Sequence, residues 1–182
     1  MEIEFSGAAQ EVTGSCHILR VGTRTVLLDC GLFQGRRNES RDKNLKLPVP
    51  VSEIDAVVLS HAHIDHAGRL PYLVAQGYKN TIWATSATRD LCALMLADSA
   101  HIQEKDAEFL ERRGRAHAEP LYRVEDTTRT LEQMIDCIQT IADDFSKVLV
   151  VTHLEVIKNA FPTRIEITKE PDTGSHFKVF LG

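Results

Sequence analysis

The chain has 182 residues, of which 43% are hydrophobic and 26% are charged, a composition that excludes a disordered chain and leaves room for one substantial core. Its net charge of −5 argues against a broad basic surface for nucleic acid, although a local basic groove stays compatible with it. No apolar run reaches the roughly 18 residues that a membrane span needs, and the N-terminus lacks the pattern of a signal peptide. We therefore expect a cytoplasmic protein with no membrane partner.

The first third of the chain predicts short strands separated by glycine turns. Residues 17–22 and 23–31 are apolar, β-branched runs joined at Gly22, which indicates a hairpin. Residues 54–60, IDAVVLS, form a nearly continuous apolar run of strand length. Such a run is typical of a strand that is buried on both faces.

Helices and strands alternate in the middle of the chain. Residues 68–77 predict a short helix, with Pro71 in its first turn and Gly77 at its end. Residues 80–85, NTIWAT, predict a strand. Residues 86–113 have the length and composition of a long helix, with Ser86 as its N-cap.

The last third predicts a polar loop followed by further helices and strands. The loop covers residues 112–127, and a helix runs from Leu131 to Phe145 because apolar residues recur there at three- and four-residue spacing. The remaining elements are a strand at residues 147–153, a short helix at residues 154–161 that ends before Pro162, and a hairpin at residues 164–182 around the turn PDTGS. The whole pattern indicates a mixed α/β or α+β fold.

The four cysteines are far apart and form no C-x-x-C pair, which argues against a disulfide framework or a zinc knuckle. We expect reduced and mostly buried thiols, as in a cytoplasmic protein, at Cys16, Cys30, Cys92 and Cys137.

A cluster of metal-ligand residues follows the apolar run at 54–60, in the segment LSHAHIDHAGRLP. If the strand ended in H-x-H, His61 and His63 would lie on the same side, because side chains alternate along a strand. A turn after them would bring Asp65 and His66 back toward the same point. Imidazole nitrogens with a carboxylate suit zinc, and also manganese or iron. The alternative is a surface loop that is merely rich in histidine.

The segment HAHIDH resembles the H-x-H-x-D-H signature of the metallo-β-lactamase fold. The segments GAAQEVTGSCHIL, LLDCGLFQG and ATSATRDLCALMLADSAHIQEKDAEF resemble the RNA-processing β-CASP branch of that superfamily, so that the likeness covers residues 2–133. The resemblance implies a four-layered αββα fold, two zinc ions and hydrolysis of phosphodiester bonds in RNA.

The same resemblance implies roles for individual residues. His61 and His63 would hold one zinc ion, and Asp65 and His66 the second, with Asp65 also positioning or deprotonating the attacking water. Asp29 matches an aspartate that orients the metal site from behind its ligands. The alternative for Asp29 is a turn residue before a glycine.

The family pattern is incomplete in this chain. After Leu131 we find neither the histidine of a GH-type motif, nor the aspartate that bridges the metals, nor the final histidine, and the inserted β-CASP domain is missing as well. The sequence therefore predicts a partial αββα half over residues 1–133 that binds zinc weakly, as a single ion.

Residues 134–182 resemble the C-terminal end of the SMC-like DNA-repair ATPases, with a helix-strand-helix-hairpin tail that packs on the same sheet or stands apart from it. In those proteins a strand ending in THL carries a switch histidine, which would be His153 here. His153 is also a candidate for a substitute metal ligand. No phosphate-binding G-x-x-x-x-G-K-[ST] loop occurs in the chain, so we do not expect nucleotide binding.

The two resemblances meet near residues 131–136, where we expect one continuous helix. A natural fusion, a misassembled frame and a chimera all remain open as its origin. Three functions follow from the sequence: a metal-dependent hydrolase acting on RNA, a catalytically incomplete metal-binding module, and a fragment of a DNA-repair ATPase. Whether the chain is an enzyme, and in what oligomeric state, stays open at this point.

Overall fold

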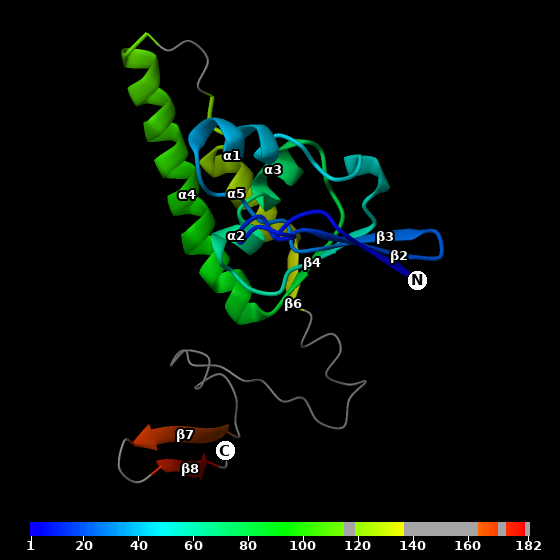
Figure 1. The fold of residues 1–182 in the computed structure, drawn as a ribbon, viewed down its shortest axis with the longest axis vertical. Coiled ribbons are helices and arrows are strands. Elements are labelled where there is room, and N and C mark those ends of the chain that lie inside the picture. Colours follow the sequence, from blue (N-terminus) through cyan, green and yellow to red (C-terminus); the bar gives the residue numbers. More distant parts are fainter. Residues whose placement is uncertain (115–118, 137–163, 171–173, 181–182) are drawn as a thin grey trace. The chain divides into compact units, whose positions relative to one another are not determined.

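The chain folds into two compact units, Met1–Asp143 and Asp144–Gly182. Each unit is described by itself, and Figure 1 shows the elements of both. The residues that the computed structural model describes are 1–114, 119–136, 164–170 and 174–180.

The first unit contains one six-stranded sheet whose strands are neighbours in chain order, β1-β2-β3-β4-β5-β6. The first three strands are antiparallel, whereas β3, β4, β5 and β6 run parallel to one another. Parallel neighbours need long crossover connections, and the helices of this unit lie in those connections. The strands are β1 Glu2–Phe5, β2 His17–Val21, β3 Arg24–Leu28, β4 Ala56–Val58, β5 Ile82–Ala84 and β6 Met134–Asp136.

The helices differ greatly in length, and the longest of them, α4, runs along one edge of the unit (Figure 1). Helix α5 packs against both α3 and α4. The helical elements are α1 Arg37–Asn44, the 3₁₀ helix η1 Val51–Glu53, α2 Ile64–Ala67, α3 Leu70–Ala75, α4 Ser86–Arg112 and α5 Val124–Gln133.

The core is built on one face of this sheet. A row of side chains in register runs across five strands and is almost fully buried, namely Ile18, Leu27, Val57, Ile82 and Met134. Buried leucines of the helices belong to the same cluster. The neighbouring row points to the other face, because side chains alternate along a strand, and there Phe5 is 63% exposed and Val58 39% exposed.

The structure confirms the mixed α/β class and most of the expected elements of the first unit. Strands β2 and β3 form the hairpin around Gly22, which adopts a positive φ of 59°. The strands expected within 54–60 and 80–85 are β4 and β5, and the helices expected at 68–77 and 86–113 are α3 and α4. Pro71 lies in the first turn of α3, as expected.

Three local expectations were wrong. A helix was expected from Leu131 to Phe145, but residues 134–136 are not helical. They form β6 beside β5, where Met134 is buried. One continuous helix across residues 131–136 is therefore also excluded. The loop expected at 112–127 ends early, since α5 begins at Val124, where the Arg123 N–H donates to the Asp126 carboxylate at 2.8 Å.

The third error concerns the start of α4. Its N-cap is Thr85 instead of Ser86, and the Thr85 hydroxyl accepts a hydrogen bond from the Thr88 N–H at 3.1 Å. Both residue types are good caps, so composition alone did not distinguish them.

The second unit contains a hairpin of β7 Arg164–Glu170 and β8 Gly174–Phe180, which are antiparallel. This confirms the hairpin expected around PDTGS. The strand expected at 147–153, the helix expected at 154–161 and the candidate residue His153 lie outside the described residues.

Cys16, Cys30 and Cys92 are free and buried, as expected, and Cys137 lies outside the described residues. Among the helices that the structure describes, none has both the length and the apolar character to cross a membrane.

Candidate metal centre

The histidine cluster lies just beyond the carboxyl end of β4, but it is not part of that strand. Strand β4 ends at Val58, His61 and His63 follow in an irregular segment, and His63 is the N-cap of α2. The expectation that strand alternation aligns His61 with His63 is therefore wrong. A short turn of helix brings the ligand candidates together instead.

The structure brings together all four side chains expected at the site. The His61 ring lies 4.6 Å from the His63 ring and 4.0 Å from the His66 ring, measured between centroids. The Asp65 Oδ2 atom lies 3.6 Å from His66 Nε2. His63 is exposed and the other three are partly exposed, so the cluster is open to small molecules from solvent.

Asp29 lies directly behind this cluster, at the end of β3. Its side chain is largely buried, and His66 Nδ1 lies 2.8 Å from its Oδ2 atom. Such a contact fixes the ring and leaves His66 Nε2 as the nitrogen that faces outward. The backbone at Asp29 adopts a positive φ of 63°, a conformation that aspartate tolerates better than most residues.

Two serines complete the surroundings of Asp29, and the sequence did not identify either of them. The Ser15 hydroxyl donates to Asp29 Oδ2 at 3.1 Å. Ser60 donates from both its N–H, at 2.8 Å, and its hydroxyl, at 3.0 Å. The Ser60 oxygen also lies 3.0 Å from His61 Nδ1, so that one hydroxyl links the carboxylate to a second imidazole. The position of Ser60, directly before the first histidine, was the available signal for that residue. For Ser15 the available signal was its place in the segment GAAQEVTGSCHIL, which resembles the β-CASP branch.

The backbone of residues 64–66 accepts hydrogen bonds from two neighbouring segments of the chain. The Ser15 N–H donates to the Asp65 carbonyl at 2.8 Å, and the Cys30 N–H donates to the His66 carbonyl at 2.8 Å. A Cβ atom at Gly31 would lie 1.6 Å from the Asp65 carbonyl oxygen. Only glycine therefore fits at position 31 without displacing Asp65.

Burial lowers the pKa of His61 below its usual value, because it disfavours the charged imidazolium. The neighbouring His66 and His63 lower this pKa further. A lowered pKa favours the neutral ring at neutral pH, and neutral imidazole is the form that binds metal ions.

The donor atoms fit a transition metal in kind and in proximity, since three imidazoles and a carboxylate lie in contact. They do not yet form a coordination shell. Within the described ranges, no group of three or more His, Cys, Asp or Glu side chains is arranged to hold a metal ion. The His61 ring makes an edge contact with the His63 ring and is tilted by 46° against the His66 ring.

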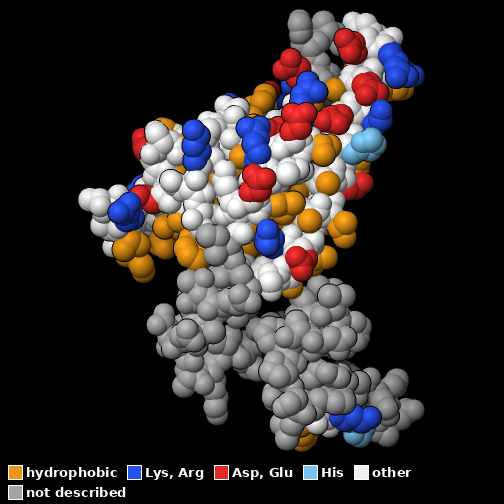
Figure 2. All heavy atoms as spheres, turned by 180° about the vertical axis from the view of Figure 1, so that it is seen from behind, with side chains coloured by type: hydrophobic (Ala, Val, Ile, Leu, Met, Phe, Trp, Pro, Cys, Tyr) orange, Lys and Arg blue, Asp and Glu red, His pale blue; other side chains and the backbone are white. Residues whose placement is uncertain are grey.

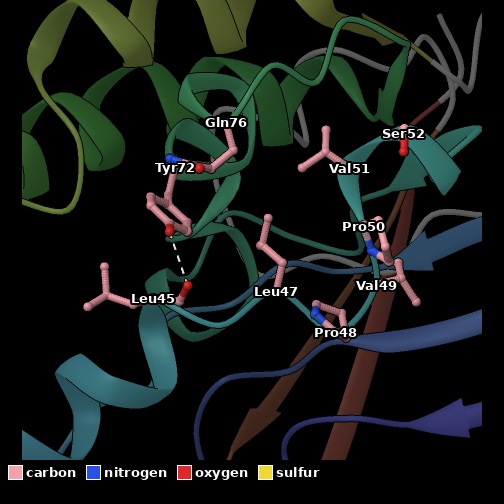
Figure 3. A pocket seen from close by; sticks show the side chains of 9 residues that line it. All are labelled: Leu45, Leu47, Pro48, Val49, Pro50, Val51, Ser52, Tyr72 and Gln76. Carbon is pink, nitrogen blue, oxygen red and sulfur yellow. Dashed lines mark hydrogen bonds between the residues drawn. The ribbon is translucent and has the colours of Figure 1, made fainter.

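A hollow separate from the histidine cluster lies beside α3. It has a volume of about 580 Å³, and the Tyr72 hydroxyl, which donates to the Leu45 carbonyl at 3.0 Å, points toward its wall (Figure 3). None of its lining residues is a histidine, cysteine or carboxylate: Leu45, Leu47, Pro48, Val49, Pro50, Val51, Ser52, Tyr72 and Gln76. This hollow therefore adds no ligand or acid–base group to the site.

Comparisons with known proteins identify the family that the chain resembles. A family model described as the metallo-beta-lactamase superfamily matches residues 9–137. Ribonuclease TTHA0252 of Thermus thermophilus is 46% identical over 105 residues, which are 58% of this chain and 24% of that protein. Transcription termination factor FttA of Methanosarcina mazei is 36% identical over 102 residues, 55% of this chain and 16% of that protein.

The chain thus spans a quarter or less of the length of these relatives. Among solved structures, the metallo-beta-lactamase fold protein YhfI from Bacillus subtilis is 18% identical, and the match covers 97% of this chain and 56% of that one, with a TM-score of 0.38. The comparisons give no support to the expected resemblance of residues 134–182 to SMC-like ATPases.

Proposed function

This chain belongs to the metallo-beta-lactamase superfamily, and from that premise we propose that its histidine cluster is the metal site of a hydrolase that cleaves phosphodiester bonds in RNA. The observation that carries the proposal is the cluster itself. His61, His63 and His66 lie in ring contact, and Asp29 lies 2.8 Å from His66 Nδ1. The names of the relatives, a ribonuclease and a transcription termination factor, support RNA as the substrate.

The proposed ligands are His61, His63, Asp65 and His66, with zinc as the ion that this donor set favours. A bound ion of this kind supplies Lewis acidity toward a phosphoryl oxygen. Asp29 orients His66, while Asp65, which is partly exposed beside His66, is placed to orient a water molecule or to accept its proton.

A second candidate is a metal-binding module with little or no turnover. The number of candidate ligands favours it, because the cluster offers four: His61, His63, Asp65 and His66. Four candidate ligands divided between two ions leave two for each, whereas a catalytic zinc usually takes three protein ligands. On this reading the chain binds one zinc ion weakly, and its cleavage of RNA lies far below that of a protein with the complete pattern.

Zinc analysis and RNA cleavage, measured on the same preparation, distinguish the two. We expect bound zinc by equilibrium dialysis, and we expect His63→Ala to weaken binding at least about tenfold. His101→Ala, which removes an exposed histidine of α4, is the matched control and leaves zinc affinity unchanged.

Cleavage of single-stranded RNA that requires zinc and is lost in His63→Ala supports the hydrolase. Zinc binding without cleavage above the metal-free background supports the module. A chain that binds no zinc overturns both candidates.

A further inference from the structure

Helix α4 carries an apolar surface on the side that faces away from the core. Its inner side is buried at Cys92, Leu96, Ala100 and Leu110. On its outer side five large apolar side chains are 39–72% exposed: Leu91, Leu94, Met95, Ile102 and Phe109, which we call the α4 stripe. At 3.6 residues per turn these five lie along one face of the helix.

Single exposed apolar residues are normal on protein surfaces, but several along one face of a helix indicate an interaction site. Apolar side chains are spread along this edge of the unit among acidic and basic ones (Figure 2). The charges on the same face of the helix indicate what covers the stripe.

Two exposed charges of opposite sign, Asp98 and Lys105, lie within the stripe. They are seven residues apart, about 10 Å along the helix, and they do not form an ion pair with each other within one chain. Two further charges flank the stripe near its ends, Asp90 toward the N-terminus and Arg113 just after the helix.

We propose that the α4 stripe binds the α4 stripe of a second copy of this chain, with the two helices antiparallel. A twofold axis that passes between His101 and Ile102 places Asp98 opposite the other copy's residue 105, and Lys105 opposite its residue 98. Both pairs join opposite charges.

The same axis matches the ends of the stripe. It places Leu94 opposite residue 109 of the other copy, and therefore packs leucine against phenylalanine twice. It also places Asp90 opposite residue 113, which is an arginine. A parallel arrangement would set Asp98 against itself and Lys105 against itself, and like charges in direct contact are repulsive. The pattern of charges therefore selects the antiparallel pair.

Two present contacts must change when the pair forms. Lys105 Nζ lies 3.2 Å from Glu108, and the Arg113 guanidinium lies 4.5 Å from the centre of the Phe109 ring. Both are surface contacts, and exposed ion pairs contribute little to stability. The apolar side chains supply the affinity of the dimer, while the charges at its centre fix the register.

Sedimentation velocity of the full chain over a series of concentrations tests the proposal. We expect a reversible equilibrium between monomer and dimer. Asp98→Lys and Lys105→Asp should each weaken the dimer at least about tenfold, because each sets like charges opposite one another. The double variant restores opposite charges in both pairs, and its dimer affinity should return to within about threefold of the original.

Glu132→Lys, a charge reversal at an exposed position of α5, is the control and leaves the dimer unchanged. Circular dichroism checks that each variant folds. If a charge variant does not fold, Leu94→Ser replaces it in the test, because it removes a packing contact without altering charge. A chain that stays monomeric at every concentration overturns the proposal. The proposal is also overturned if neither charge reversal weakens the dimer, or if the double variant does not recover the dimer affinity of the original chain.

Discussion

At the scale of single residues, Asp29 is the point at which the candidate site is held together. It accepts hydrogen bonds from Ser15 and Ser60 and contacts His66 at 2.8 Å, although it lies in a left-handed backbone conformation. Three segments that are distant in the chain therefore meet on one carboxylate. Any change at Asp29 affects the fold and the metal site together.

Asp29→Ala should lower the free energy of unfolding by at least about 2 kcal/mol, because it leaves the buried Ser15 hydroxyl and the partly buried donors of Ser60 without their acceptor. Urea denaturation measures the change. The same variant should bind zinc more weakly, since His66 loses the contact that orients it.

Two variants control this prediction. Asp42→Ala, at an exposed position of α1, should change the unfolding free energy by no more than about 0.5 kcal/mol. Asp29→Asn keeps one oxygen acceptor and tolerates the positive φ, so it should fall between the original and the alanine variant. Equal stability of Asp29→Ala and Asp42→Ala would contradict the role given to Asp29.

Burial raises the pKa of the Cys92 thiol to about 12, because the apolar surroundings disfavour the thiolate. A raised pKa keeps the thiol protonated at all pH values below it, and the protonated form is not nucleophilic. At pH 8 the native protein should therefore fail to react with a thiol reagent at Cys92, whereas the protein in denaturant should react at all four cysteines. Rapid modification of Cys92, located by mass spectrometry of the native protein, would show that it is accessible after all.

The sequence identified four residues of the site because residue type and spacing carry that information, namely His61, His63, Asp65 and His66. Asp29 followed only from the resemblance to the metallo-β-lactamase fold. The sequence did not identify Ser15 or Ser60. A serine reveals no role by its type, and these two reach Asp29 only after the strands have paired.

At the scale of elements, the start of α4 depends on one hydroxyl. Thr85 accepts from the Thr88 N–H at 3.1 Å, whereas Ser86 already lies inside the helix. Thr85→Ala should cost about 1 kcal/mol in the free energy of unfolding, as the loss of an N-cap usually does. Ser86→Ala is the matched control and should cost less than about 0.5 kcal/mol. The reverse order of the two effects in urea denaturation would restore Ser86 as the cap.

Strand β6 shows why the element boundaries were harder to predict than the elements. The spacing of apolar residues after Leu131 is helical, yet Met134 pairs with Ile82 and is 4% exposed in a strand of three residues. Burial beside β5 stabilises Met134 in the strand conformation. That gain comes from tertiary contacts, which a local pattern does not contain.

At the scale of the whole molecule, one buried row across five strands holds the first unit together. Leu27 is the second residue of this row and is fully buried between Ile18 and Val57. Leu27→Ala should lower the free energy of unfolding by about 2–5 kcal/mol, because it leaves a cavity in the core. Val12→Ala, at a position that is 89% exposed, should leave it within about 0.5 kcal/mol. Matching thermal midpoints for the two variants would argue against this row as the core.

The alternation of strands and helices predicted the fold class. This pattern is repeated along the chain, so wrong boundaries of single elements do not change the predicted class. The order of the strands did not follow from it. Which strands are neighbours depends on the direction of each crossover, and no residue of the sequence encodes that direction by itself.

The mixture of antiparallel and parallel pairing has a consequence for the order of folding. The β2–β3 hairpin closes over a turn at Gly22, a short loop that costs little entropy and closes early. Pairing of β3 with β4 requires the chain between them, including α1, to be closed first, so it comes later. Asp29 and His66 meet only across that parallel pair, because one follows β3 and the other follows β4. A metal ion held by His66 would therefore be a ligand of the late, complete sheet, and it would slow the opening of that sheet without changing how the hairpin forms.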